Sequence, residues 1–523
     1  MSRRARPERS IPAPGPPQGQ TEQASTARPG ELAFALAGAA AVLLVVGVGA
    51  SRHELWRDEM DAWLAARDAP SPLALLHAIR YGGHPVSWYL LLWPLTRWPG
   101  APWAMQALSV ALAGASAFVV LRLAPGPRWL RLLCVLGYFP VYEYGVLARN
   151  YALSVLGLAA LAWATTRRRE RPLTLGAVAA AAAFTTPHGL FLVVAVLAVL
   201  GGELALRPPP AAARGRAWAG LALGAAGAIV TALSIRTPPD GAYAGGWALG
   251  WDGGRAEFML ATVVRAWLPL PEPGLWFWST NAVASALSPG ALAALGAALL
   301  AGALVALRRA PAAAALLVVG AGGLLAFGQL RFVGYLRHWG FLWLCLCFAA
   351  WMAGASPVRP GRLARAAFAL LAAVHVAAAG VALREDLRLR FSAAGATAEL
   401  IRRAGAADLP LVGVVDFTAM NVVGHLGAAR AWYPHGRRWG SHILFDEARN
   451  HDVADAWGEA AAFVARHGGP AVVVLDVLTV RAQPPPPALA PRLRKLGCER
   501  SDVVGDESYC VWVLRPEPPR ATP

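Results

Sequence analysis

The sequence predicts an all-α polytopic membrane protein that carries a small α/β domain at its C-terminal end. Of its 523 residues, 56% are hydrophobic and only 15% are charged. Roughly eleven apolar stretches approach the ~20 residues that a membrane-spanning helix needs, and short segments with Arg, Pro or Gly separate them. After Arg384, short β-like runs alternate with helical patterns. This composition excludes a disordered chain and does not fit an ordinary soluble enzyme.

The N-terminal segment 1–30 differs from everything that follows. It carries Arg3, Arg4, Arg6 and Arg9 among many Pro, Gly, Ser and Gln residues, and this mixture cannot bury a core. We therefore expect a disordered cytoplasmic tail. The apolar run that follows is long for a signal peptide, so we expect a first helix that is retained.

Arginine clusters predict the topology, because cytoplasmic loops of bacterial-type membrane proteins concentrate basic residues. Five clusters, at 122–131, 167–171, 207–216, 308–309 and 359–365, alternate with segments that are then extracytoplasmic. The predicted spans are 31–50, 105–123, 131–147, 150–166, 173–187, 189–206, 217–235, 285–307, 311–329, 339–355 and 364–383. This topology makes the chain a multi-pass protein of the cell (inner) membrane with its N-terminus in the cytoplasm. It divides the chain into a tail (1–30), a transmembrane domain (31–383) and an extracytoplasmic α/β domain (384–523).

Two long outside loops, 51–104 and 236–284, interrupt the spans. In the first, the apolar stretch Trp88–Trp98 is too short to cross the membrane and should lie in the interface or re-enter from outside. The second contains five tryptophans, which fit either an aromatic belt at the membrane surface or a lid over a sugar. They are Trp247, Trp251, Trp267, Trp276 and Trp278.

The predicted outside segments contain several charged residues next to apolar runs. If the first loop opens with a helix, Asp58, Asp61 and Asp68 lie away from its apolar face, either as a solvated surface or as working carboxylates. Arg149 lies between two apolar runs. It either snorkels to the interface or binds an anionic partner, because an arginine on the outer side opposes the orientation rule.

Three motifs together resemble a known family. They are Trp56-Arg57-Asp58-Glu59, Gly83-His84-Pro85, and Ala148-Arg149-Asn150-Tyr151-Ala152-Leu153. In this order the chain, over about 31–390, is similar to glycosyltransferase family 39-type proteins of the GT-C superfamily, which include protein O-mannosyltransferases and lipid A aminoarabinose transferases. Two positions depart from the family pattern. Val86 replaces a second proline, and Leu147 replaces a glutamate for which Glu143, one helical turn earlier, is a substitute.

The resemblance implies a polyprenyl-phosphate-linked sugar donor and transfer with inversion to a hydroxyl of a lipid, glycan or protein on the outer face. Asp58 is then the base that takes the hydroxyl proton, and Glu59 orients Asp58 or the acceptor. Preorganised donors must stabilise the departing phosphate, and Arg149 together with the Arg337-His338 pair are the candidates. The further substrate-binding candidates are His84, Tyr151 and His188. For Arg337 and His338 an anchoring role at the interface, and for His188 a role in breaking the helix, are the alternatives.

Other chemistries find no support in the sequence. It has no zinc-spaced Cys/His cluster and no Gly-Lys-Ser/Thr loop. We predict no required cofactor, although Asp58, Glu59 or Asp61 could share a divalent cation with the donor phosphate. The arginines lie in short loops, which points to membrane lipids as partners and not to nucleic acid.

Two alternative functions remain open: a polytopic transporter or lipid flippase, and a non-catalytic GT-C-like scaffold. A transporter should carry ionisable residues in mid-span and an internal repeat.

The cysteines divide into two groups. Cys134, Cys345 and Cys347 lie in apolar runs and are expected to be buried thiols. Cys498 and Cys510 lie 12 residues apart in the outside domain, with a possible hairpin turn at 503–506 between them. Because that compartment permits oxidation, we predict a disulfide between them.

The topology yields a direct prediction. Alkaline phosphatase fused after residue 390 should be active, because the enzyme matures only outside the cytoplasm. An inactive fusion, combined with an active cytoplasmic reporter at the same site, would overturn the order of spans and the placement of the candidate site.

Overall fold

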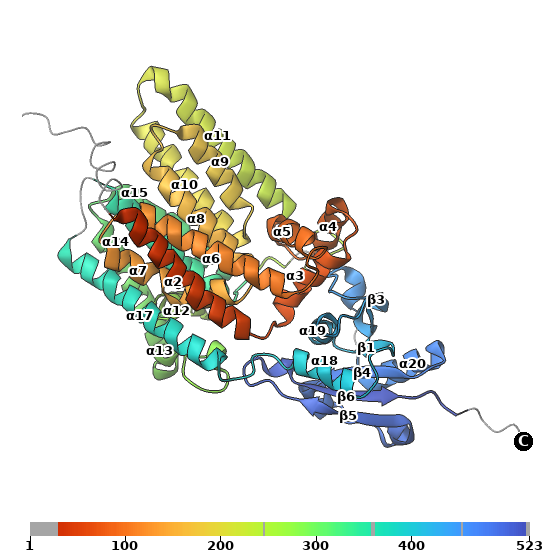
Figure 1. Ribbon diagram of the computed structural model, residues 1–523. Coiled ribbons are helices and arrows are strands. Elements are labelled where there is room, and N and C mark those ends of the chain that lie inside the picture. Colours follow the sequence, from red (N-terminus) through yellow and green to blue (C-terminus); the bar gives the residue numbers. More distant parts are fainter. Residues whose placement is uncertain (1–29, 244–245, 357–360, 451–452, 519–523) are drawn as a thin grey trace, which may run out of the picture.

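The computed structural model describes residues 30–243, 246–356, 361–450 and 453–518. The predicted cytoplasmic tail and Arg359 of the last arginine cluster lie outside the described residues. Figure 1 shows a bundle of helices with a sheet-containing domain at one end, formed by the C-terminal part of the chain. The predicted division into an apolar helical domain and a C-terminal α/β domain agrees with this architecture.

Eight helices in the described part of the chain are long and apolar enough to cross a membrane. Each coincides with one of the predicted spans, so the chain is a multi-pass membrane protein. They are α2 (Glu31–Arg52), α6 (Trp103–Leu123), α10 (Pro187–Leu206), α11 (Ala211–Ser234), α14 (Pro289–Leu307), α15 (Pro311–Leu330), α16 (Leu336–Gly354) and α17 (Arg362–Asp386).

The other three predicted spans differ from simple crossings. Helices α8 (Tyr151–Thr166) and α9 (Pro172–Ala183) are apolar but short. The span expected at 131–147 is divided into α7 (Arg128–Val135) and the π-helix η1 (Phe139–Val146). Pro140 lacks a backbone N–H and so cannot continue a regular helix, which explains the break.

Short helices occupy the loops on one side of the bundle. The first loop contains α3 (Arg57–Asp68), α4 (Pro72–Ile79) and α5 (Ser87–Leu95). With nine residues, α5 is too short to cross the membrane, as predicted. The second loop contains α12 (Gly253–Trp267), η2 (Phe277–Ser279) and α13 (Ala282–Ala286). Helix α12 packs against α14 and α16, so part of this tryptophan-rich loop belongs to the bundle.

The C-terminal domain is built on a six-stranded mixed sheet with the order β3-β2-β1-β4-β6-β5. The strands are β1 (Leu411–Gly413), β2 (Ala431–Tyr433), β3 (Arg438–Gly440), β4 (Ala471–Asp476), β5 (Leu493–Glu499) and β6 (Tyr509–Leu514). The helices are α18 (Ala394–Arg403), α19 (Asp416–Leu426), α20 (Ala456–His467) and α21 (Val477–Ala482), with 3₁₀ turns η3 (Pro434–Gly436), η4 (Glu447–Asn450), η5 (Pro487–Arg492) and η6 (Gly505–Glu507). Every residue of β4 is buried, because apolar clusters cover both faces of the sheet.

The structure joins Cys498 and Cys510 by a disulfide across the antiparallel pair β5 and β6. In unreduced, denatured protein, an alkylating reagent should therefore modify Cys134, Cys345 and Cys347, which are free, but neither Cys498 nor Cys510. Mass spectrometry of the peptides gives the answer, with the three free thiols as an internal control. Closing this short loop should contribute on the order of 3 kcal/mol to the stability of the domain. Alkylation of both Cys498 and Cys510 would reject the pairing.

Candidate active site

The site is organised around the first turn of α3, which follows shortly after the C-terminal end of α2. Trp56, the residue before α3, is buried, and its ring packs edge to face on Trp278 at 4.9 Å. Phe391, at the entry to the C-terminal domain, contacts the same pair of rings. The beginning of α3 therefore lies where the first loop, the tryptophan-rich loop and the C-terminal domain meet.

Glu59 is fully buried and has hydrogen-bond partners on both carboxylate oxygens. Its Oε1 accepts from the backbone N–H of Ala148 at 2.5 Å, and its Oε2 accepts from the N–H of Trp56 at 3.1 Å. Oε2 also lies 3.1 Å from Nε2 of His53. The sequence left open whether Glu59 orients Asp58 or the acceptor; in the structure its contacts are to the protein, and Ala148 is the residue before Arg149.

His53 extends this network to the end of α17. Its Nδ1 lies 3.0 Å from Oδ2 of Asp386, so the imidazole bridges two carboxylates. Burial opposes protonation, but the charges of Asp386 and Glu59 outweigh it and raise the pKa of His53 well above its ordinary value. A protonated ring donates one hydrogen bond to each carboxylate, which ties α2, α3 and α17 together.

Asp58, one residue earlier, faces the opposite way and contacts two arginines. Its Oδ2 accepts from Arg149 and, at 3.0 Å, from Nη2 of Arg337. A quarter of the Asp58 side chain is exposed, against 13% for each arginine. Burial favours the neutral acid, but the two guanidinium charges are stronger and lower the pKa of Asp58. We name these three residues the Asp58 cluster; it carries one positive charge in excess.

The two arginines come from segments far apart in the sequence. Arg149 lies between η1 and α8, and Arg337 lies in the first turn of α16. The guanidinium of Arg337 lies over three aromatic rings, those of Trp56 at 5.2 Å, Trp278 at 5.8 Å and Tyr335 at 4.7 Å. Such contacts stabilise the cation without using its N–H donors. Nη2 of Arg337 donates to Asp58, and its Nε, which has no partner among the described residues, stays available for an anion.

The predicted histidines surround the Asp58 cluster. The rings of His188 and His338 stack at 4.8 Å, and Tyr151 meets His338 edge to face at 6.1 Å. His84, from the loop between α4 and α5, is near enough to be affected by the charges of the cluster. Burial, followed by the charge of Arg149, lowers the pKa of His84 to about 4, so this ring is neutral at physiological pH.

Several polar atoms around the cluster are buried and have no hydrogen-bond partner among the described residues. They are Nε of Arg337, Nδ1 of His84 and the hydroxyl of Tyr151. Buried polar groups are normally satisfied, so unsatisfied ones that gather in one place indicate where a polar ligand binds. Every residue that the sequence singled out for donor binding thus converges on one place. Their individual roles stay predictions.

The carboxylate face of α3 is covered by the C-terminal domain. Asp61 accepts a hydrogen bond from the N–H of Ile443 at 3.0 Å, and Asp68 accepts one from the hydroxyl of Ser441. Burial, with a smaller effect of the Asp58 charge, raises the pKa of Asp61 to about 7. The side of α3 that carries Asp61 and Asp68, for which a solvated surface was one alternative, therefore forms a contact between the two domains.

The tryptophan-rich loop crosses this contact. Asp240 accepts a hydrogen bond from the hydroxyl of Tyr81 at 2.7 Å, and the N–H of Ala242 donates to the carbonyl of Phe445 in the C-terminal domain at 2.7 Å. Oε2 of Glu143 accepts hydrogen bonds from Nε1 of Trp278 at 2.9 Å and from the hydroxyl of Tyr138 at 3.0 Å. Its Oε1 is buried without a partner among the described residues, and a substitute role for Glu143 stays a prediction. Of the five tryptophans, Trp278 lies at the site, whereas Trp251 is exposed.

Sequence reasoning did not find the bond from His53 to Asp386 or the role of Trp278 beside Arg337. Both depend on contacts between segments that are far apart in the sequence, and no local motif announces them. Within the described residues, no group of three or more His, Cys, Asp or Glu side chains is arranged to hold a metal ion.

Comparisons with known proteins add a similarity to a solved structure. No protein-family model matches the chain, and no curated protein matches it. Among solved structures, it is similar to the crystal structure of ArnT from Cupriavidus metallidurans bound to undecaprenyl phosphate. The two are 15% identical, with a TM-score of 0.49, over 91% of this chain and 97% of that chain. This structural similarity concerns the fold of the chain and does not extend to its chemistry.

The buried network predicts that Glu59 acts on stability. Glu59→Ala leaves His53 and two backbone N–H groups without their acceptor, and breaking such a buried pair typically costs about 3–5 kcal/mol. The matched control is Glu399→Ala, which removes ion pairs to Arg402 and Arg403 at a half-exposed position. It should cost less than about 1 kcal/mol. Thermal unfolding of both variants in detergent measures the difference. Equal unfolding temperatures would contradict a structural role for Glu59.

Proposed function

We propose that this chain is an integral membrane glycosyltransferase. It transfers a monosaccharide from a polyprenyl-phosphate donor to a hydroxyl acceptor on the extracytoplasmic face, with inversion at the anomeric carbon. The observation that carries this proposal is the Asp58 cluster, in which two arginines share one carboxylate. Beside it, Nε of Arg337, Nδ1 of His84 and the hydroxyl of Tyr151 are buried without a hydrogen-bond partner among the described residues. The motif resemblance in the sequence supports the same reaction.

In this proposal Arg149 and Arg337 bind the phosphate of the donor. Guanidinium groups pair with phosphate oxygens through two parallel hydrogen bonds, which gives both affinity and orientation. As the sugar leaves, the phosphodiester becomes a monoester and gains one negative charge. The two cations are in position to stabilise that charge.

Asp58 is the base in this reaction. The acceptor oxygen forms a bond to the anomeric carbon on the face opposite the phosphate, the bond from that carbon to the phosphate oxygen breaks, and the hydroxyl proton passes to Asp58. While both arginines contact Asp58, its pKa is low and its basicity weak. A phosphate that takes over these arginines frees the carboxylate and raises its basicity, so donor binding prepares the base.

The positions of charged residues favour an enzyme over a transporter or flippase. In the eight long apolar helices, the Asp, Glu and Arg residues all lie within about two turns of a helix end. An ionisable side chain near the middle of these helices is His375 of α17, whose ring stacks on Trp343 at 3.9 Å and makes no ion pair within the described residues. A transport pathway usually requires ionisable groups near the middle of the membrane. Only a measurement of sugar transfer distinguishes the enzyme from a non-catalytic scaffold with the same fold. We propose no required metal, and transfer in the presence of EDTA tests this point.

The test begins with the donor, which lipid-linked sugar profiling of a deletion strain identifies as the species that accumulates. Purified protein should then transfer a labelled sugar from that donor. Asp58→Asn keeps the shape of the side chain but removes the base, and should lower the rate about 100- to 10,000-fold while donor binding persists. Arg149→Ala should weaken donor binding, the chemical step or both. The matched control, Asp68→Asn on the same helix, should transfer sugar at the wild-type rate.

The pH profile distinguishes the two candidate bases on α3. Because the pKa of Asp58 is low before the donor binds, kcat/KM of a reaction that depends on Asp58 should stay constant as the pH falls from 8 to 6. A rate that decreases below pH 7 and is lost in Asp61→Asn would assign the base to Asp61, whose pKa is about 7. Asp58→Asn with a near wild-type rate would reject Asp58 as the base.

A further inference from the structure

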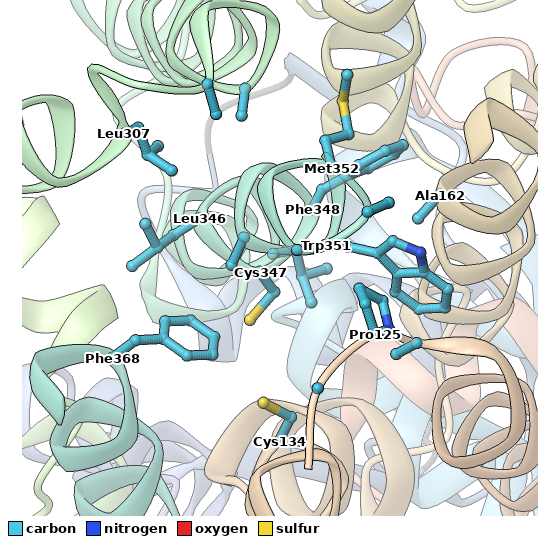
Figure 2. Close-up of a pocket in the computed structure, with 18 of the residues that line it drawn as sticks. Pro125, Cys134, Ala162, Leu307, Leu346, Cys347, Phe348, Trp351, Met352 and Phe368 are labelled. Atoms are coloured by element: carbon cyan, nitrogen blue, oxygen red, sulfur yellow. The ribbon is translucent and has the colours of Figure 1, made fainter. Parts of the chain in front are cut away.

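A large cavity lies between the helices, extending to the end of the bundle that is farthest from the Asp58 cluster. Its volume is about 2480 Å³, and residues of α6, α7, α8, α14, α16 and α17 line it (Figure 2). Helix α16 begins beside the cluster and runs about 28 Å to its other end, which also lines the cavity. That distance is close to the ~30 Å thickness of a hydrocarbon core, so the far end and the cluster belong to opposite membrane faces.

The interior of the cavity is apolar. Leu307, Leu346 and Phe368 border the open space from three different helices (Figure 2). Small-molecule pockets in proteins typically measure about 300–1,000 Å³, so this space is far larger than a sugar or a nucleotide needs. Packed interiors keep few voids larger than a water molecule. An apolar space of this size between membrane helices therefore suits hydrocarbon chains.

The far end of the cavity is strongly basic. Nine arginines and two glutamates belong to the lining, and the two best-defined ion pairs use Arg168 with Glu203 and Arg131 with Glu31. Arg308 and Arg309 have no ion-pair partner in the part of the chain that the structure describes. Nη1 of Arg122 is buried without a hydrogen-bond partner there. We name the adjacent pair Arg308 and Arg309 the arginine rim.

We propose that this cavity is a binding site for an anionic diacyl phospholipid of the leaflet that faces away from the Asp58 cluster. The phosphate binds the arginine rim, and the acyl chains fill the apolar space between α14, α16 and α17. We choose an anionic phospholipid as the ligand because of charge complementarity. The basic rim matches the phosphate, and the apolar interior matches the two hydrocarbon chains. The polyprenyl donor is disfavoured here, since its phosphate belongs at the other end of the bundle. This inference does not depend on the proposed function.

Native mass spectrometry of the purified full-length protein tests the site, with phosphatidylglycerol, phosphatidylcholine and a polyprenyl phosphate as probes. Wild-type protein should bind phosphatidylglycerol in preference to phosphatidylcholine. Each arginine near a lipid headgroup contributes about fivefold in affinity, so Arg308→Gln combined with Arg309→Gln should weaken phosphatidylglycerol binding about 30-fold. A matched control is Arg481→Gln with Arg494→Gln, two exposed arginines of the C-terminal domain, which should leave binding unchanged.

A second variant keeps the charge and fills the space. Gly302 lines the cavity, and a Cβ added there would meet no atom within 4 Å. Gly302→Trp should therefore fold normally and reduce binding of phosphatidylglycerol by occupying room that the acyl chains need. Equal affinity for the two phospholipids, or unchanged binding in both cavity variants, would overturn the proposal. Displacement of phosphatidylglycerol by polyprenyl phosphate would instead assign the cavity to the donor lipid.

Discussion

The arrangement of the candidate site depends on one buried carboxylate, that of Glu59. Its two oxygens bind the backbone of Trp56 and Ala148, and its contact with His53 continues to Asp386 at the end of α17. A buried charge without partners is very unfavourable, so these groups are stable only in this mutual position. The network thereby determines where α3 begins and where the chain turns before Arg149.

The position of Glu59 also determines which residues Asp58 contacts. Successive residues on a helix point in directions about 100° apart, so Asp58 points away from Glu59 and towards Arg149 and Arg337 at the N-terminal ends of α8 and α16. The C-terminal domain secures the same turn from the other side, since Glu507 accepts a hydrogen bond from the N–H of Arg57 at 2.8 Å. The membrane domain and the α/β domain therefore share one small contact region, and the candidate chemistry takes place inside it.

Much of the fold could be predicted because local patterns determine it. Apolar length identified the eight long helices, and the short β-like runs expected after Arg384 correspond to strands of one sheet, in which β1 and β4 are parallel neighbours. The span at 131–147 was different, because hydropathy does not register how Pro140 interrupts a helix. For the site, the motifs identified residues that do converge. Which side of α3 each carboxylate occupies depends on partners such as His53 and Ile443, and no spacing in the sequence reveals those contacts.

The shortness of α8 and α9 has a consequence for the membrane itself. With 16 and 12 residues they span only about 24 and 18 Å, whereas the neighbouring α11, with 24 residues, spans about 36 Å. A bilayer adapts to short hydrophobic segments by thinning locally. Next to α8 and α9 the bilayer surface on the side of Arg149 should therefore lie closer to the middle of the membrane. A lipid phosphate that diffuses along this surface descends to the depth of the arginines without leaving its leaflet.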